Sequence, residues 1–188
     1  MGTGGEAVES GERSLRGWGG LATIFYAIHA GQHILHGRPE DLLWACHLGA
    51  LVVGLGLIVG RARIVAVGFL WLCLGNVFWL LDLAGGGELI PTSLLTHVGG
   101  LAIGLLGVVR LGIPRGSAWH AIVAFLLLQQ ICRWTTPAAV NINLAHSVWI
   151  GWEETFPSYW SYQAALLGIG LMSFALIEAG WRRARRLR

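Results

Sequence analysis

The sequence predicts an all-α membrane protein, a polytopic bundle of six transmembrane helices in one domain. Apolar residues make up 55% of the 188 residues and charged residues only 12%, whereas a soluble domain carries about 25% charged residues. Long apolar segments recur along the chain, and the few positive residues fall mostly between alternate segments. This composition excludes an ordinary soluble enzyme, a disordered chain and a nucleic-acid-binding protein of the usual basic kind.

The predicted helices follow from the thickness of a bilayer, whose hydrocarbon core of about 30 Å needs about 20 apolar residues to cross. The first of the six segments is weakened by three histidines and several glycines, and the fifth is short. A disordered cytoplasmic leader, 1–16, precedes the transmembrane domain, 17–181, and a basic cytoplasmic tail, 182–188, follows it. The segments are residues 18–36, 42–60, 64–83, 89–109, 118–132 and 159–180.

The arginines predict the orientation of the bundle. With six spans, all of the 13 positive residues except Arg38 and Arg133 lie on the side of the two termini. Positive residues concentrate on the cytoplasmic side, so we expect a multi-pass protein of the inner (plasma) membrane with both termini in the cytoplasm. A cleaved signal peptide ending near Ala30 is the alternative, but the leader is acidic and its apolar run is interrupted by glycine.

The connection 135–158, on the predicted outer side, is the longest between two spans. Val148, Trp149, Trp152 and Phe156 share one face at helical spacing. This pattern predicts an amphipathic helix lying in the outer membrane interface before the last span. Such a helix would serve either as a lid over a site or as an anchor in the headgroup belt.

Two Gly-x-x-x-Gly motifs fall in the inner halves of the second and fourth spans, at Gly56 and Gly60 and at Gly100 and Gly104. Small residues at this spacing allow helix backbones to approach closely. The motifs predict tight packing at the inner end of the bundle, and they are also candidate contact faces for partner membrane proteins.

Polar residues of the spans gather at their outer ends. A polar group in hydrocarbon costs several kcal/mol unless it is satisfied, and ionisable residues in spans usually face the bundle interior and mark function. We therefore expect a polar cavity that opens to the outer side. Besides the candidates for chemistry described below, its predicted lining includes His36, Asn76, Gln129, Asn141 and Asn143.

A histidine motif in the first span is the sharpest candidate site. His29, His33 and His36 follow one another at spacings of four and three, which places them on one stripe of a helix. Imidazole is a common ligand of Zn and Fe, and His47 and His97 lie at comparable depth in neighbouring spans. The predicted metal ligands are His29, His33, His47 and His97. The alternative is three solvated histidines at a helix end.

Two charged residues are candidates for catalysis beside this metal. Asp82, at the outer end of the third span, could be a ligand, an orienting group or a base. Arg133, near the outer interface, could clamp a phosphate or carboxylate. Its alternative role is a contact with lipid phosphate, or with the Asp82 or Glu88 carboxylate.

Four short runs resemble a family of uncharacterised bacterial multi-pass inner-membrane proteins: Leu42–His47, Trp79–Asp82, Leu94–His97 and Pro137–Asn143. The resemblance covers the chain from the first helix to the outer connection. It implies the same topology and points to Asp82, His97, Asn141 and Asn143, but to no known activity. The chain departs from that family at His47, where an aspartate is common, and at Leu80, where an asparagine is common.

Three functions are consistent with these residues. The first is a metal-dependent membrane hydrolase, in which three ligands leave one metal position for a water whose pKa falls to about 7, acting on a lipid-like substrate. The second is an electron-transfer protein that binds quinone or holds a haem between His47 and His97. The third is a non-catalytic subunit or assembly factor that binds partner helices through its glycine faces.

Overall fold

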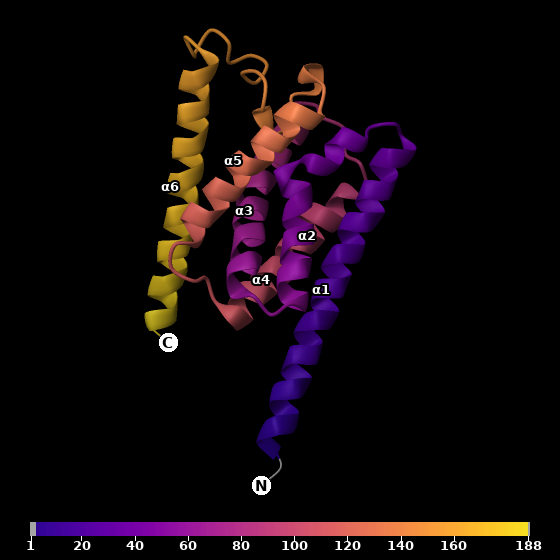
Figure 1. Cartoon of the computed structure of the whole chain (residues 1–188), viewed down its shortest axis with the longest axis vertical. Coiled ribbons are helices and arrows are strands. Elements are labelled where there is room, and N and C mark those ends of the chain that lie inside the picture. The colour runs from indigo at the N-terminus through magenta and orange to yellow at the C-terminus, as the bar shows by residue number, and fades with distance from the viewer. Residues whose placement is uncertain (1–2, 188) are drawn as a thin grey trace.

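The computed structural model describes the backbone of residues 3–187 and the side chains of residues 11–187. Six α-helices, four short 3₁₀ or π turns and no strand make up the regular structure of this range (Figure 1). The all-α class is therefore confirmed, and one helix lies in each predicted segment. The helices are α1 (Thr3–Leu35), α2 (Ala45–Ile58), α3 (Ala62–Ala84), α4 (Gly100–Leu111), α5 (Ser117–Thr135) and α6 (Tyr159–Arg186).

Two of these helices, α3 and α6, are both long enough and apolar enough to cross a membrane. The helix α2 has 14 residues, a length of about 21 Å at 1.5 Å per residue, which is less than a bilayer core. The helix α4 is preceded by a π-helical turn, η2 (Leu95–Gly99), and together they form a second short apolar helix. The described residues thus give two candidate spans of full length and two shorter ones.

The predicted disordered leader, 1–16, differs from the structure, in which α1 begins at Thr3 and continues without a break to Leu35. The segment holds no proline, and Glu9 and Glu12 each stand four residues before an arginine, a spacing that favours helix. The first turns of α1 project beyond the other helices (Figure 1). Residues 1–2 of the leader, and Arg188 of the predicted tail, lie outside the described residues.

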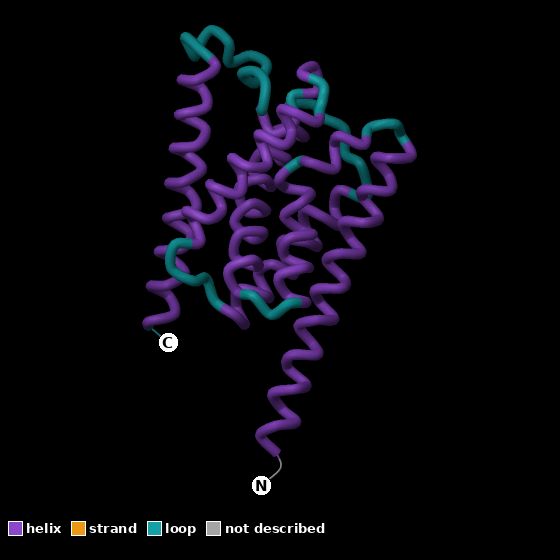
Figure 2. Tube along the Cα trace, viewed as in Figure 1, coloured by secondary structure: helices purple, strands orange, loops and turns teal. Residues whose placement is uncertain are grey.

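The predicted amphipathic helix in the connection before α6 is wrong. Between Leu144 and Tyr159 the described chain forms turns and bends, drawn as loop in Figure 2. Gly151 has a φ of +88°, in the left-handed region that interrupts a right-handed helix, and Pro157 follows. The apolar spacing is helical, but a turn closed by a hydrogen bond from Trp152 N to the Trp149 carbonyl oxygen interrupts the segment.

Close backbone contacts join α1, α2 and α3. A Cβ atom on Gly19 of α1 would lie 2.7 Å from the Gly54 carbonyl oxygen of α2, and a Cβ on Gly68 of α3 would lie 2.7 Å from that of Gly49. No side chain fits at either crossing, so glycine fixes how near the helices lie. The helices α1 and α2 pack directly against each other, and the turn η1 (Pro39–Leu43) joins them at the other end.

The predicted Gly-x-x-x-Gly motifs are occupied mostly by contacts within the chain. Gly56 packs against Val65 of α3, and a Cβ on Gly100 would lie 2.8 Å from the Cβ of Ala50. Gly104 is also buried. Gly60 instead forms the turn after α2, with a φ of +66°.

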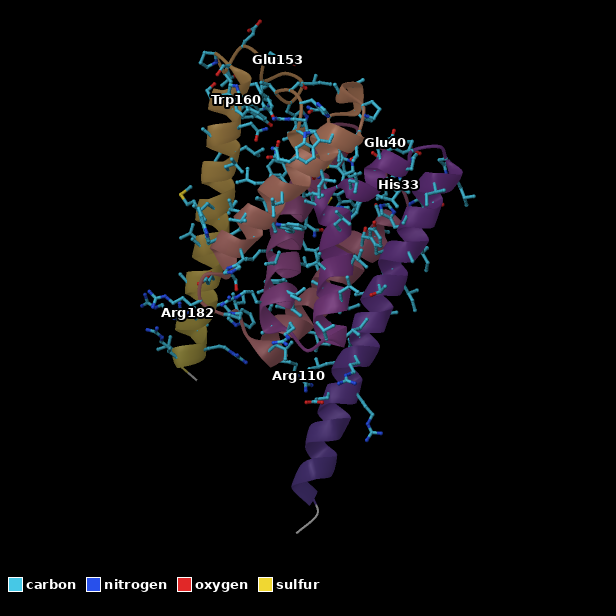
Figure 3. The ribbon with its side chains drawn as sticks, viewed as in Figure 1. His33, Glu40, Arg110, Glu153, Trp160 and Arg182 are labelled. Carbon is cyan, nitrogen blue, oxygen red and sulfur yellow. The ribbon has the colours of Figure 1, made fainter. Side chains whose placement is uncertain are left out.

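Charged residues mark the two ends of the molecule. Arg110 and Arg182 lie toward the end where α6 finishes, and His33 and Glu40 lie toward the opposite end, together with Glu153 and Trp160 (Figure 3). The first turns of α1 and the last turns of α6 lie at the arginine end (Figure 1).

Candidate metal centre

Three histidines from two helices converge at the end of the bundle opposite the arginines. His29 and His33 lie one turn apart on α1, and His47 lies in the first turn of α2; all three are buried. Nε2 of His29 lies 3.1 Å from Nε2 of His47 and 3.2 Å from Nε2 of His33. One nitrogen from each ring lies within 4.8 Å of the other two. These three residues therefore form a group that could hold a metal ion.

The outer nitrogens of two of these rings contact the same residue, Asp41. Nδ1 of His47 donates to the Asp41 carbonyl oxygen at 2.8 Å, and Nδ1 of His33 lies 3.2 Å from the Asp41 carboxylate oxygen Oδ2. A carbonyl oxygen only accepts, so Nδ1 of His47 carries a proton, and the neighbouring carboxylate favours a proton on Nδ1 of His33 as well. The Nε2 atoms of neutral His33 and His47 are then lone pairs that point toward His29.

Two nitrogen lone pairs this close repel each other unless a proton or a cation lies between them. A Zn²⁺ ion bound to tetrahedral nitrogens at 2.0–2.1 Å would set them about 3.3 Å apart, close to the distances observed. Without an ion, His29 could donate one Nε2–H to one neighbour, with its Nδ1 accepting from the Thr92 hydroxyl 2.9 Å away. One of the two facing nitrogens would still lack a partner, so the residues fit a bound cation better.

Asp41 has the surroundings of a residue that orients metal ligands. The residue is 3% exposed, and it lies in the 3₁₀ turn η1 (Pro39–Leu43) between α1 and α2. Oδ2 contacts Arg38 Nη2 at 2.6 Å, and Oδ1 accepts from Trp44 Nε1 at 3.2 Å. Carboxylates that accept from the outer nitrogen of a metal-binding histidine fix its ring and raise its basicity.

A fourth histidine, His97, lies beside this group. It sits in the π-helical turn η2, and its ring centroid is 5.4 Å from that of His47. Its Nδ1 donates to the Ser93 carbonyl oxygen at 3.0 Å, while its buried Nε2 has no hydrogen-bond partner. The Trp79 ring stacks on it at 4.5 Å. His97 therefore presents a lone pair at the site, and π-helical turns are frequent at functional sites.

Cys46 offers a further donor next to His97. Its Sγ, a nitrogen of His47 and a nitrogen of His97 lie within 4.8 Å of one another. The structure places this half-buried thiol at the edge of the site. The two groups share His47, so they describe one cluster of donor atoms and not two separate centres.

A cavity of about 430 Å³ opens beside these residues. His29, His33, His47 and His97 all line it, together with Arg38 and Asp41. Most of the remaining lining is apolar or aromatic, from α3, α5 and α6. A pocket that combines an apolar wall with a few converging polar groups is the usual form of a small-molecule site.

The structure places Asp82 at this cavity but apart from the histidines. It is exposed, near the end of α3, and it lines the cavity with Glu88. Neither candidate metal group in the described part of the chain includes it. The buried carboxylate in contact with the histidines is Asp41, which the sequence analysis did not single out.

Arg133 does not line the cavity. Its guanidinium donates to the Ala145 carbonyl oxygen at 2.6 and 2.9 Å and to the Tyr159 hydroxyl at 2.7 Å. The rings of Tyr159 and Trp160 lie beside it. These contacts use its hydrogen-bond donors to hold the loop before α6, in place of the expected clamp on a substrate.

His36 and Asn76, predicted as cavity residues, have local partners. The helix α1 ends at Leu35, and His36 turns outward, with Nδ1 donating to the Gln32 carbonyl oxygen at 2.8 Å. Asn76 donates to the carbonyl oxygens of Leu72 and, at 3.3 Å, of His97. It braces the π-helical turn that carries His97.

Three predicted amides fix the loop that follows α5. Asn143 lines the cavity; its Oδ1 accepts from Ala45 N at 2.8 Å, and its Nδ2 donates to the Leu43 carbonyl oxygen at 2.7 Å. Gln129 donates to the Asn143 carbonyl oxygen, and the Asn141 side chain accepts from two backbone N–H groups of its own turn. The hydrogen bonds of these three amides hold the loop in place. Those of Asn143 also fix the start of α2, just before His47.

A haem held between His47 and His97 does not fit this arrangement. A porphyrin would occupy the plane around an iron bound to His47 Nε2, but Nε2 of His29 already lies 3.1 Å from that atom. Axial histidines leave the equatorial positions to the macrocycle. The crowding of imidazoles around one point favours a bare ion.

Comparison with known proteins gives no information on the function of this chain. No protein-family model, no curated protein and no solved structure matches the chain. The function is therefore inferred from the donor atoms, their second contacts and the cavity beside them.

Proposed function

We propose that the chain is an integral membrane protein that binds one divalent metal ion, such as Zn²⁺ or Fe²⁺, on His29, His33 and His47, and uses it to hydrolyse a lipid-like substrate. The observation that carries the proposal is the convergence of three Nε2 atoms, two of which belong to rings whose Nδ1 atoms are held by Asp41. Three imidazole ligands that leave one coordination position open toward a cavity are typical of a catalytic metal site.

The membrane setting is supported by the apolar faces that point away from the bundle. Only 17% of the most apolar stretch of α6 is buried, whereas the core helix of a soluble protein would bury most of it. Ile169 is 53% exposed and Met172 is 59% exposed. Apolar surface on this scale requires lipid or another protein to cover it. We propose six spans, with the shorter helices α2 and α4 at the centre.

The orientation follows from the charges at the two ends. Arg110 and Arg182 lie at one end and His33 at the other (Figure 3), and arginine-rich ends face the cytoplasm. We therefore propose cytoplasmic termini in an inner membrane, with the metal centre toward the extracytoplasmic side. A substrate would then enter from the outer leaflet.

In the proposed hydrolysis, the metal ion activates the water and the substrate, and His97 accepts a proton. A metal ion on three imidazoles lowers the pKa of a bound water and polarises a carbonyl or phosphoryl oxygen. His97 holds its Nδ1 proton on Ser93, so Nε2 can take a proton from the attacking water. In ester hydrolysis the water oxygen bonds to the carbonyl carbon, the ester C–O bond breaks, and the proton passes to the leaving alcohol.

Metal content tests the first half of the proposal. Protein purified from membranes in detergent should contain about one equivalent of ion by elemental analysis after dialysis. His33→Ala and the double variant His29→Ala with His47→Ala should lose it, while His36→Ala, on the same helix but outside the cluster, should retain it. A metal-free native protein, or equal metal content in His33→Ala and His36→Ala, would overturn the site.

Hydrolysis tests the second half. Native protein in vesicles of phosphatidylethanolamine and phosphatidylglycerol should release lipid hydrolysis products, measured by mass spectrometry. Chelation should stop the release and added Zn²⁺ or Fe²⁺ should restore it. Product formation that persists equally in the His33→Ala variant would show that hydrolysis does not depend on this centre.

A further inference from the structure

We infer that the cavity beside the metal centre binds the acyl chain of a lipid, in an apolar arm between α3, α5 and α6, so that the bond cleaved is the acyl ester. This rests on the proposed function and specifies its substrate class. The argument comes from a single cavity whose lining combines the four histidines with an apolar wall from α5 and α6.

The apolar arm differs sharply from the histidine end in chemistry. No charged or hydrogen-bonding side chain is contributed to the lining by α5 and α6, and the described lining residues from these helices are aliphatic, aromatic or glycine. Such a wall offers no partner for a sugar, a peptide or a nucleotide, whose polar groups would be left unsatisfied. It suits a hydrocarbon chain. These residues are Ile122, Phe125, Leu166, Leu167, Gly170 and Phe174.

Gly170 holds the arm open where α6 crosses α5. A Cβ on this residue would lie 3.2 Å from Cδ1 of Ile122 and 3.9 Å from Cδ2 of Leu74. Any larger side chain must therefore enter the arm or move its walls. Gly168, two residues earlier, would meet nothing within 4 Å, so it is exposed on a different face of the same helix.

The position of α6 gives the chain a route from the bilayer. In Figure 1, α6 stands at one side of the molecule, with α5 crossing obliquely beside it. It packs mainly against α5, and its most apolar stretch is largely unburied. The arm therefore lies behind a helix that we propose faces lipid, so an acyl chain would enter past α6 without crossing water.

The arrangement of the ends selects the scissile bond. An acyl chain that fills the arm places its first polar group, the carboxyl carbon, at the cavity end that carries His97 and His47. The headgroup then lies toward Arg38, Asp82 and Glu88 at the polar part of the lining. We expect fatty acid release, and not release of the headgroup phosphate.

Photocrosslinking tests the arm independently of catalysis. The probe is a phosphatidylglycerol with a diazirine at the end of one acyl chain, added at trace level to the detergent-solubilised full chain. Mapped by mass spectrometry, the label should fall on peptides containing Ile122, Phe125 and Gly170. Gly170→Leu should reduce this label at least fivefold, and Gly168→Leu, the matched control, should leave it unchanged.

Two further variants distinguish loss of acyl binding from misfolding and from loss of the metal. Leu74→Phe fills the arm from α3 and should also reduce the label, while metal content stays as in the native chain. His29→Ala with His33→Ala should lose the metal but keep the label. Label that is spread over Met172 and Leu176 on the outward face, and that none of the arm variants reduces, would overturn the acyl site even if the metal is present.

Discussion

The carboxylate of Asp41 lies 3.2 Å from Nδ1 of His33, and both side chains are buried. The same residue accepts a hydrogen bond from His47 through its carbonyl oxygen at 2.8 Å. One residue of the turn η1 thus sets the proton positions on rings from two helices. This relationship, more than the count of histidines, makes the cluster a candidate metal centre, because it leaves both inner nitrogens free to bind.

Asp41→Asn should weaken metal binding by about 10–100-fold, the usual loss when an orienting carboxylate is changed. The amide removes the charge that holds the His33 proton but keeps the size of the side chain. Competition with a chromogenic chelator would measure the affinity. Glu40→Gln removes the same charge from the adjacent residue and should leave the affinity unchanged; an equal loss in both variants would argue for a general electrostatic effect.

His97→Ala should retain the metal and lose activity. If His97 accepts the proton from water, its loss should lower kcat by about 10²–10⁴-fold, with added imidazole restoring part of the rate. Elemental analysis and a fatty acid release assay would be run on the same samples. His120→Ala is the control, because that histidine is exposed and bonded to Gly116 at the arginine end. Loss of the metal in His97→Ala would assign this residue as a ligand instead.

The sequence could predict the helices and the histidine cluster because both depend on regular spacing. Four residues along α1 separate His29 from His33, and depth along neighbouring spans matched them with His47 and His97. Asp41 could not be found in this way. It reaches His33 through a 3₁₀ turn that Pro39 begins, and no periodic pattern records the path of such a turn.

The wrong predictions have the same origin. His36 continues the spacing of His29 and His33, but α1 ends at Leu35 and the ring turns away. The apolar residues of the loop before α6 share a helical period, yet Gly151 has left-handed backbone. The spacing of side chains does not predict where the backbone stops being helical. Arg133 was placed at the correct end, but its partners are carbonyl oxygens that a sequence does not reveal.

Glu178→Gln should destabilise the fold by about 1–2 kcal/mol through the start of α5. The buried carboxylate accepts from Gly116 N at 2.8 Å and from Ala118 N at 2.9 Å, and an amide would turn one NH₂ group toward a donor. Thermal unfolding in detergent would measure the change. Arg182→Ala removes the partner 3.8 Å from Glu178, and as a loosely held ion pair it should cost less than about 1 kcal/mol. A larger loss for Arg182→Ala would contradict the capping role.

Cysteine labelling should show the two ends of the molecule on opposite sides of the membrane. Ser147 lies in the exposed loop before α6 and Arg183 near the end of that helix, and both are exposed. In intact bacterial spheroplasts a membrane-impermeant maleimide should modify Ser147→Cys but not Arg183→Cys, and disruption of the membrane should expose both. The native chain, whose three cysteines are buried or half-buried, provides the blank. Labelling of Arg183→Cys in intact spheroplasts would contradict the proposed orientation. The arginine end would then face outward, and the metal centre would lie on the cytoplasmic side.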